Sequence, residues 1–308
     1  MIAQSQNKLK YTNSCFLVLI ASLIWGGTGI VANYLYRDGF TFYEVTAIRI
    51  FTTFLFSCLF KIRKTKTNKF ARKDVLLCSI IGFCVAAFML CYFATIQLLS
   101  VAVAVILLYT APIFVVILSA IFFKEKIGAL TIFAVLLSIV GCFFISGIFE
   151  QKAEIKLIGL ILGLLSGVGY AMYIILTKVL INKKLKDTDI MFVVFLFSSL
   201  FSFPFLISAI PKIVSDIKIV CLCLSIGGLC GFLPYLLYSI SLNNLSSTTA
   251  SIIVTTEPLF AAILSFLIFQ EKLSIFSIMG FSIIICSILL ILISNKRRFT
   301  NERQEHRG

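Results

Sequence analysis

A single carboxylate, Glu257, stands in the middle of an apolar run, 246–269, that is long enough to cross a membrane. Pro258 follows the carboxylate directly. Burying a charged side chain in hydrocarbon costs about 2.5 kcal/mol or more, so an acid at this depth indicates a functional site. At 1.5 Å per residue Glu257 lies about 17 Å into the predicted helix, close to the bilayer centre. We expect Glu257 to bind a substrate ammonium group or to take up a coupling proton, with a purely structural acid as the alternative.

The same stretch occurs earlier in the chain in a changed form. A shift of 146 residues lays 92–126 over 238–272 with 14 identities in 35 positions. Pro112 matches Pro258, but Ala111 stands where the second copy has Glu257. Because proline removes a helical hydrogen bond, we expect a helix break at both prolines, either as a kink or as part of a cavity lining. The chain is therefore a duplication whose copies differ in charge at the centre.

Arg49 is a second charge inside an apolar run, at 42–60. Its planar, permanently charged guanidinium suits a carboxylate or a phosphate. An ion pair with Glu44 or Glu257, or an orientation toward the interface, would explain it equally well. Four further side chains complete the predicted substrate site: Tyr92, Tyr109, Tyr238 and Thr256. Aromatic faces near a carboxylate suit a cationic amine, whereas packing and hydrogen bonds to carbonyls freed by the prolines are the alternatives.

The composition places the chain in a lipid bilayer. Hydrophobic residues make up 60% and charged residues 13% of its 308 positions, and the mean hydropathy is +1.08. The net charge of +14 does not indicate a nucleic-acid partner, because the basic residues lie between apolar runs and at the ends. The ten cysteines show no Cys-x-x-Cys spacing, and the one histidine, His306, lies in the polar tail. We therefore expect no metal site, no cofactor and no enzymatic centre.

Ten apolar runs predict an all-α integral membrane protein with ten transmembrane helices, since each run is close to the ~20 residues that a helix needs to cross the hydrocarbon. The runs are 15–36, 42–60, 75–98, 101–123, 129–149, 157–181, 190–210, 219–242, 246–269 and 274–293. With the N-terminus in the cytoplasm, the inner segments hold 20 Lys and Arg residues and the outer loops hold 6. This asymmetry predicts a multi-pass protein with both termini cytoplasmic.

Together, the duplication and the topology predict two inverted five-helix repeats. The duplicated stretches fall on the fourth and ninth runs, so the repeats are 15–149 and 157–293, flanked by cytoplasmic segments at 1–14 and 294–308. An odd number of helices per repeat puts the halves in opposite orientations. That architecture permits alternating access to a substrate site near the midplane. The sequence has no Walker motif, so we do not expect ATP to drive the process.

Several short motifs lie along the chain, and one of them, a Pro…Glu block, occurs in both halves. They are Trp25-Gly26 in the first run, Arg49 in the second, Tyr92 in the third, and the Pro112…Glu125 and Pro258…Glu271 blocks. In these motifs the chain resembles the EamA family of the drug/metabolite transporter superfamily over nearly its whole length, as two EamA units. The second unit departs from the pattern, because Gly167-Val168-Gly169-Tyr170 stands where the first has Trp-Gly. No role of Trp25 is therefore carried over to it.

The resemblance implies export or exchange of a small metabolite across the inner (plasma) membrane. The family moves amino acids, drugs, sugars, choline-like amines and nucleotide derivatives, so the substrate stays open. Our leading hypothesis is a secondary carrier for a zwitterionic or cationic metabolite, with proton coupling open. A flippase for a lipid-linked headgroup or sugar and a passive channel are the alternatives. The glycine ridges at 159–167 and 227–231 indicate close helix packing, either within a monomer or at a homodimer seam.

Overall fold

In the computed structural model the chain forms helices joined by short turns. The structure describes residues 2–62, 70–125, 127–146, 148, 156–270 and 274–305, so the predicted motif residue Glu271 lies outside the described residues, as does His306. The helices are α1 (Ile2–Gly26), α2 (Thr28–Arg37), α3 (Phe42–Ile62), α4 (Arg72–Leu98), α5 (Val101–Leu108), α6 (Ala111–Phe123), α7 (Ala129–Ile145), α8 (Leu157–Asn182), α9 (Asp187–Ile213), α10 (Ile217–Gly227), the π-helix η2 (Gly228–Phe232), α11 (Leu233–Ser241), α12 (Ser247–Val254), α13 (Glu257–Phe269) and α14 (Ile275–Glu305).

Within the described residues, nine helical segments are long and apolar enough to cross a membrane. They are α1–α2, α3, α4, α5–α6, α8, α9, α10–α11, α12–α13 and α14. The prediction of an all-helical, multi-pass membrane protein is confirmed. The predicted count of ten full-length spans is not confirmed, because the predicted run 129–149 forms a helix of 17 residues that ends at Ile145. Helix also continues into both predicted tails, since α1 begins at Ile2 and α14 runs to Glu305.

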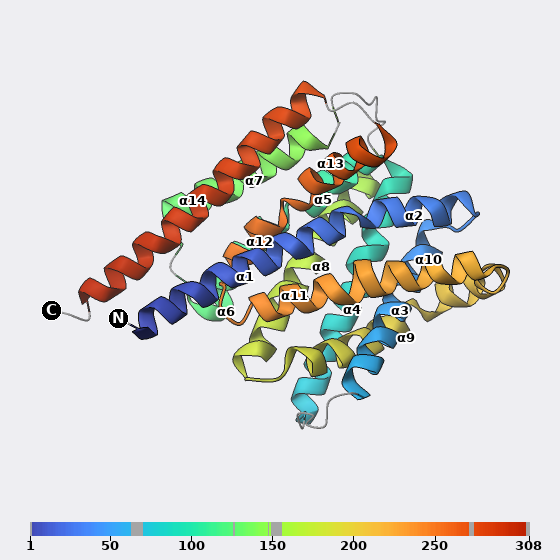
Figure 1. Ribbon diagram of the computed structural model, residues 1–308, viewed down its shortest axis with the longest axis horizontal. Coiled ribbons are helices and arrows are strands. Elements are labelled where there is room, and N and C mark those ends of the chain that lie inside the picture. Colours follow the sequence, from blue (N-terminus) through green and yellow to red (C-terminus); the bar gives the residue numbers. More distant parts are fainter. Residues whose placement is uncertain are drawn as a thin grey trace.

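The helices α7 and α14 lie side by side along one flank of the molecule (Figure 1). Glycines let their backbones approach, because a Cβ atom added at Gly141 would lie 3.1 Å from the carbonyl oxygen of Gly280. Ser287 Oγ donates a hydrogen bond to Ala134 O at 2.7 Å across the same pair. Small residues at a helix contact are typical of packing in membranes, where lipid supplies little hydrophobic drive between helices.

Both predicted glycine ridges pack against helices of the same chain. A Cβ atom at Gly159 would lie 2.6 Å from Leu99 Cγ, and one at Gly167 would lie 2.7 Å from Thr110 Oγ1. The ridge at 227–231 faces threonines of α3 in the same way. Close intramolecular packing therefore accounts for the glycine spacing.

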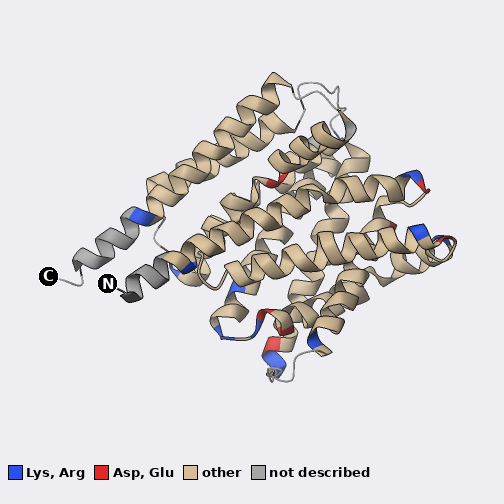
Figure 2. Ribbon diagram, viewed as in Figure 1, with Lys and Arg blue, Asp and Glu red and all other residues tan. Residues whose placement is uncertain are grey.

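The described charged residues lie mostly toward the ends of the helices (Figure 2). Lys183 Nζ pairs with Asp74 Oδ1 at 2.6 Å, and Lys212 Nζ pairs with Glu44 Oε2 at 2.8 Å. Both members of each pair come from segments predicted on the same side of the membrane. The pairs therefore agree with the predicted topology, and which side is cytoplasmic stays a prediction.

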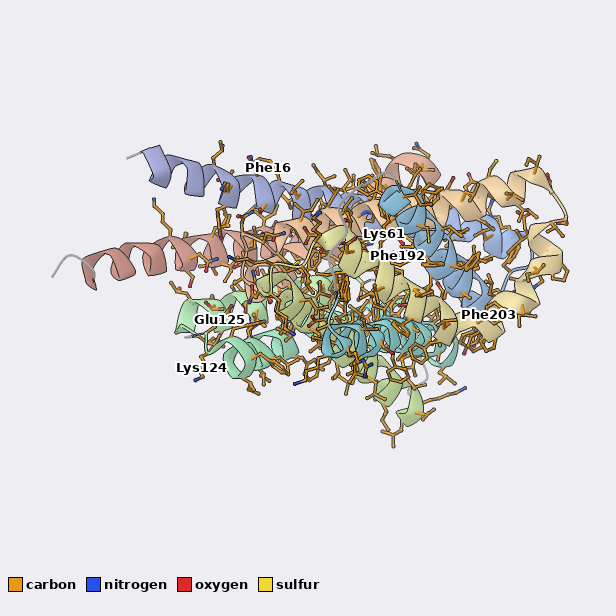
Figure 3. The ribbon with its side chains drawn as sticks, turned by 90° about the horizontal axis from the view of Figure 1, so that it is seen from below. Phe16, Lys61, Lys124, Glu125, Phe192 and Phe203 are labelled. Carbon is orange, nitrogen blue, oxygen red and sulfur yellow. The ribbon has the colours of Figure 1, made fainter. Side chains whose placement is uncertain are left out.

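The outer surface of the bundle is apolar. Large hydrophobic side chains such as Phe16 and Phe203 are exposed and lie on the outer surface (Figure 3). Near the end of α3, the ammonium of Lys61 stands 3.9 Å from the ring centroid of Phe192 (Figure 3). A cation–π contact of this kind holds a lysine at the rim of an apolar surface. The exterior is thus suited to contact lipid.

Candidate functional site

The ninth apolar span is interrupted immediately before Glu257. The helix α12 ends and α13 begins at Glu257, with Thr255 and Thr256 between them. The two threonine hydroxyls donate to the carbonyl oxygens of Ile252 and Ile253 at 2.6 and 2.8 Å, so they satisfy backbone groups at the break. Because Glu257 is the first residue of α13, it stands at the positive end of that helix, where a negative charge is stabilised.

The fourth span has the matching interruption. The helix α5 ends at Leu108 and α6 begins at Ala111, with Tyr109 and Thr110 between them. Pro112 and Pro258 are the second residues of α6 and α13, where proline is tolerated because its missing N–H would have no helical partner. Helix ends therefore occur at both proline positions, and their role in a cavity stays a prediction.

The surroundings of Glu257 come from both halves of the chain. The Tyr109 side chain, 3% exposed, lies within electrostatic reach of the carboxylate. The end of α1 lies against the start of α13, since a Cβ atom at Gly26 would be 3.0 Å from Glu257 O. Glu257 nevertheless keeps some accessible surface. The carboxylate therefore stands where the two helix breaks and the first helix meet.

Arg49 approaches the same region from α3. Its Nη2 donates to the carbonyl oxygen of Cys230 in the π-helix η2 at 2.9 Å, while its Nε is buried without a hydrogen-bond partner. The guanidinium interacts electrostatically with Glu257, but among the described residues these two do not form an ion pair. The alternative pairing with Glu44 is not found either, because Glu44 binds Lys212.

Tyrosines surround the two charges. Tyr92 and Tyr235 each lie within electrostatic reach of both Arg49 and Glu257. Tyr36 lies within reach of Arg49. Their rings give the site a polarisable, hydrogen-bonding wall, which suits a ligand with an ammonium group.

The predicted site residues therefore divide into two groups. The structure brings Arg49, Tyr92, Tyr109 and Glu257 together. Thr256 is adjacent in sequence, but its hydroxyl donates to the carbonyl oxygen of Ile253 in α12. Tyr238 is fully buried and packs on Trp25 with ring centroids 5.8 Å apart, so its ring is part of the core packing.

Sequence reasoning missed several members of this site. Tyr36 and Tyr235 gave no signal that set them apart from other aromatic residues in apolar runs. The carbonyl oxygen of Cys230 is a backbone group in a π-helix, and the sequence alone does not predict a π-helix at this position. Within the described residues, no three His, Cys, Asp or Glu side chains gather as they would around a metal ion.

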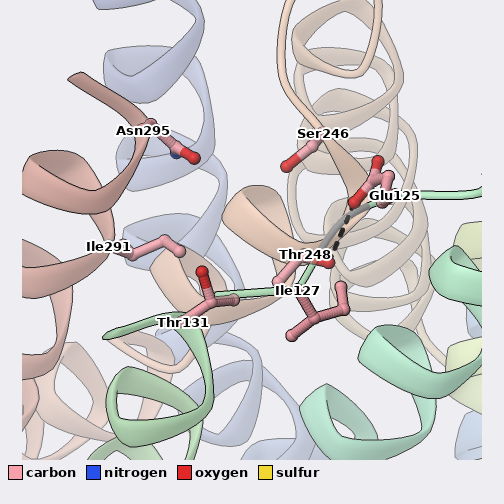
Figure 4. A pocket seen from close by; sticks show the side chains of 7 residues that line it. All are labelled: Glu125, Ile127, Thr131, Ser246, Thr248, Ile291 and Asn295. Atoms are coloured by element: carbon pink, nitrogen blue, oxygen red, sulfur yellow. Dashed lines mark hydrogen bonds between the residues drawn. The ribbon is translucent and has the colours of Figure 1, made fainter. Parts of the chain in front are cut away.

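A second polar cluster lies at the end of the bundle that is predicted to face the cytoplasm. It lines a small pocket formed by Glu125, Ile127, Thr131, Ser246, Thr248, Ile291 and Asn295 (Figure 4). Thr248 Oγ1 donates to Glu125 Oε2 at 3.4 Å. Asn295 Nδ2 donates to Thr249 Oγ1 at 2.7 Å and to Tyr11 Oη at 3.0 Å. The cluster thus ties α1, α12 and α14 together at one end of the molecule.

Comparison with known proteins identifies relatives of the whole chain. It is 25% identical to the "Uncharacterized transporter YxxF" of Bacillus subtilis (strain 168) over 280 residues, which cover 90% of this chain and 88% of the relative. It is 27% identical over 264 residues to an "Uncharacterized transporter" of Archaeoglobus fulgidus, covering 85% and 91% of the two chains.

A protein solved by crystallography has the same fold, with a TM-score of 0.74 at 12% identity, over 93% of this chain and 98% of that one. Residues 12–147 and 157–293 each match the sequence profile described as the EamA-like transporter family. The chain therefore belongs to the EamA-like transporter family, with two copies of the family's unit.

Proposed function

We propose that this protein is a secondary carrier that moves a small metabolite with an ammonium group across the plasma membrane, and that Glu257 binds that group. The observation that carries the proposal is the position of Glu257. It is a partly buried carboxylate at the start of a half-helix inside an otherwise apolar span, in a chain that belongs to a transporter family. A charge placed there without a ligand or a coupling ion would be a costly feature to keep.

The packing of the helices supports an inverted repeat that works by alternating access. When the repeats are overlaid by the sequence shift, contacts in one half have counterparts in the other. The packing of α4 and α6 on α8 corresponds to that of α11 and α13 on α1, while α3–α9 and α7–α14 join equivalent helices. Such pairing fits halves related by a pseudo-twofold axis, which can rock about a fixed central site.

An ammonium ligand fits the groups around Glu257 better than a proton alone. A coupling proton needs only the carboxylate, whereas the Tyr109 hydroxyl and the rings of Tyr92 and Tyr235 add hydrogen-bonding and cation–π partners. Cation–π contacts contribute about 0.5–2 kcal/mol each, depending on desolvation. These groups support a site that recognises an organic cation or the cationic part of a larger molecule.

The test is ligand-dependent thermal stabilisation of the purified protein in detergent, with amines and amino acids as probes. Glu257→Gln removes a charge-assisted hydrogen bond of about 1.5–3 kcal/mol, so we expect affinity to fall about 10- to 150-fold. Asp216→Asn is the matched control, because it makes the same carboxylate-to-amide change at an exposed position. Unchanged affinity in Glu257→Gln would remove the proposal. Flux into liposomes that does not saturate would instead favour a channel.

A further inference from the structure

The guanidinium of Arg49 makes one hydrogen bond to the protein and has a buried donor without a partner. Nη2 binds the carbonyl oxygen of Cys230 at 2.9 Å, but Nε is buried and has no hydrogen-bond partner. A buried polar donor without a partner costs about 1–3 kcal/mol, and more when it is charged. A ligand that supplies an acceptor would satisfy this donor.

The nearby carboxylates do not fill that role. Glu44, five residues earlier on the same helix, is bound by Lys212 at 2.8 and 3.0 Å and by the backbone N–H of Thr41 at 2.7 Å. Glu257 interacts with Arg49 electrostatically without an ion pair between them. Arg49 and Glu257 are therefore near enough to interact electrostatically, but they are not in contact as an ion pair.

The geometry points to a zwitterionic ligand, and this inference rests on the proposed function. We propose that Arg49 binds the carboxylate of a compact zwitterion whose ammonium group is bound by Glu257, and that the Cys230 carbonyl holds the guanidinium when the site is empty. The guanidinium fork matches a carboxylate with two parallel hydrogen bonds, which one backbone carbonyl does not provide. The ligand class is thus an amino acid or a molecule that carries the same two groups.

Charge balance favours a zwitterion over a simple amine. An amine bound at Glu257 would place a second cation near Arg49 and leave the guanidinium unpaired. A simple acid bound at Arg49 would leave Glu257 unpaired in the same way. A ligand that lacks either the carboxylate or the ammonium group would leave Arg49 or Glu257 unpaired, so the site would select against it. A zwitterion satisfies both ends and adds no net charge.

The π-helix explains why a carbonyl is available to hold Arg49. A π-turn shifts the backbone hydrogen-bond pattern and often marks a functional position. Here α3 contacts this segment through two donors, since Thr53 Oγ1 binds Gly227 O at 3.1 Å and Arg49 binds Cys230 O. When a carboxylate binds the guanidinium, the threonine hydrogen bond and the close packing of the glycines on α3 remain. Ligand binding would therefore exchange one of the two hydrogen bonds between α3 and this segment.

The experiment compares three forms of each proteinogenic amino acid: the free amino acid, its decarboxylated amine and its N-acetyl derivative. Binding is measured by thermal stabilisation of the full-length protein in detergent. For wild type, we expect at least one amino acid to bind at least tenfold more tightly than its amine and its N-acetyl form. Arg49→Gln should abolish the preference for the amino acid over the amine while amine binding is kept. Arg37→Gln, an exposed arginine-to-glutamine change, should leave the preference intact.

The outcomes separate this inference from the proposed function. If amines bind wild type as tightly as amino acids and still depend on Glu257, the zwitterion site is wrong and the carrier of ammonium compounds stands. If no probe depends on Glu257, both fail. If Arg49→Gln does not fold, Arg49→Lys retains the charge without the fork and should weaken only the amino acid. Equal preference in Arg49→Lys and wild type would overturn the inference.

Discussion

Gly26, the last residue of α1, should tolerate no side chain. A Cβ atom there would lie 2.8 Å from Ala261 N, 3.0 Å from Glu257 O and 3.1 Å from Phe260 Cβ. Two of these three atoms are backbone of α13 and the third is fixed to it. The clash therefore has to be relieved by moving α1 away from the helix that carries Glu257.

The chain provides its own control for this substitution. Overpacking by one methyl group costs about 1–3 kcal/mol, which is the destabilisation expected for Gly26→Ala. Gly29 is three residues away in α2, and a Cβ atom there would meet nothing within 4 Å. Because alanine is up to about 1 kcal/mol better than glycine in a helix, Gly29→Ala should be neutral or stabilising. The two variants should differ in unfolding free energy by about 1–4 kcal/mol.

Unfolding in detergent micelles measures this difference, and ligand binding measured on the same samples tests its link to the site. Gly26→Ala should be less stable than wild type and should bind the ligand more weakly, since the shift displaces the start of α13. Gly29→Ala should match wild type in binding. Equal stability of the two variants would refute the close contact between α1 and α13. Lost stability with unchanged affinity would refute the link between this contact and Glu257.

Two further substitutions test the polar contacts at the ends of the bundle. Lys212→Gln should lower the unfolding free energy by about 1–3 kcal/mol, because it leaves the buried Glu44 carboxylate with a backbone donor but without its cation. Chemical denaturation measures the loss, and Lys218→Gln at a neighbouring exposed lysine should show none. Asn295→Ala and Thr249→Ala should be coupled by about 0.5–3 kcal/mol in a double-mutant cycle, since the two side chains share a 2.7 Å hydrogen bond. Additive effects would contradict a tie between α12 and α14.

The membrane-spanning character of the fold was predictable because it depends on length and apolarity alone. The break between α1 and α2 was not, since Gly27 lies in an uninterrupted apolar run without a proline. The prolines at 112 and 258 did mark the two other breaks. Helix ends were the weakest prediction, as α1 and α14 continue beyond the apolar runs because polar residues are also compatible with helix outside the hydrocarbon.

The charged residues of the site were predictable from the sequence. Arg49 and Glu257 contrast with the apolar residues around them, so their types alone singled them out. Tyr235 has the same chemistry as Tyr238, and both rings pack on Trp25, yet Tyr235 also lies within electrostatic reach of both Arg49 and Glu257. Only the fold decides between them, because their positions differ by less than one helical turn in sequence. The carbonyl of Cys230 has no side-chain signature at all.

The difference between the two copies has a physical reason. The matched breaks of α5–α6 and α12–α13 meet at the centre, where Tyr109 of one copy lies close to Glu257 of the other. Ala111, the counterpart of Glu257, is two residues from Tyr109 and is 1% exposed. A glutamate at both positions would bring two carboxylates to the same region, and like charges there disfavour each other's ionised form. Keeping the carboxylate in one copy and a small apolar residue in the other leaves a single carboxylate where the two helix breaks meet.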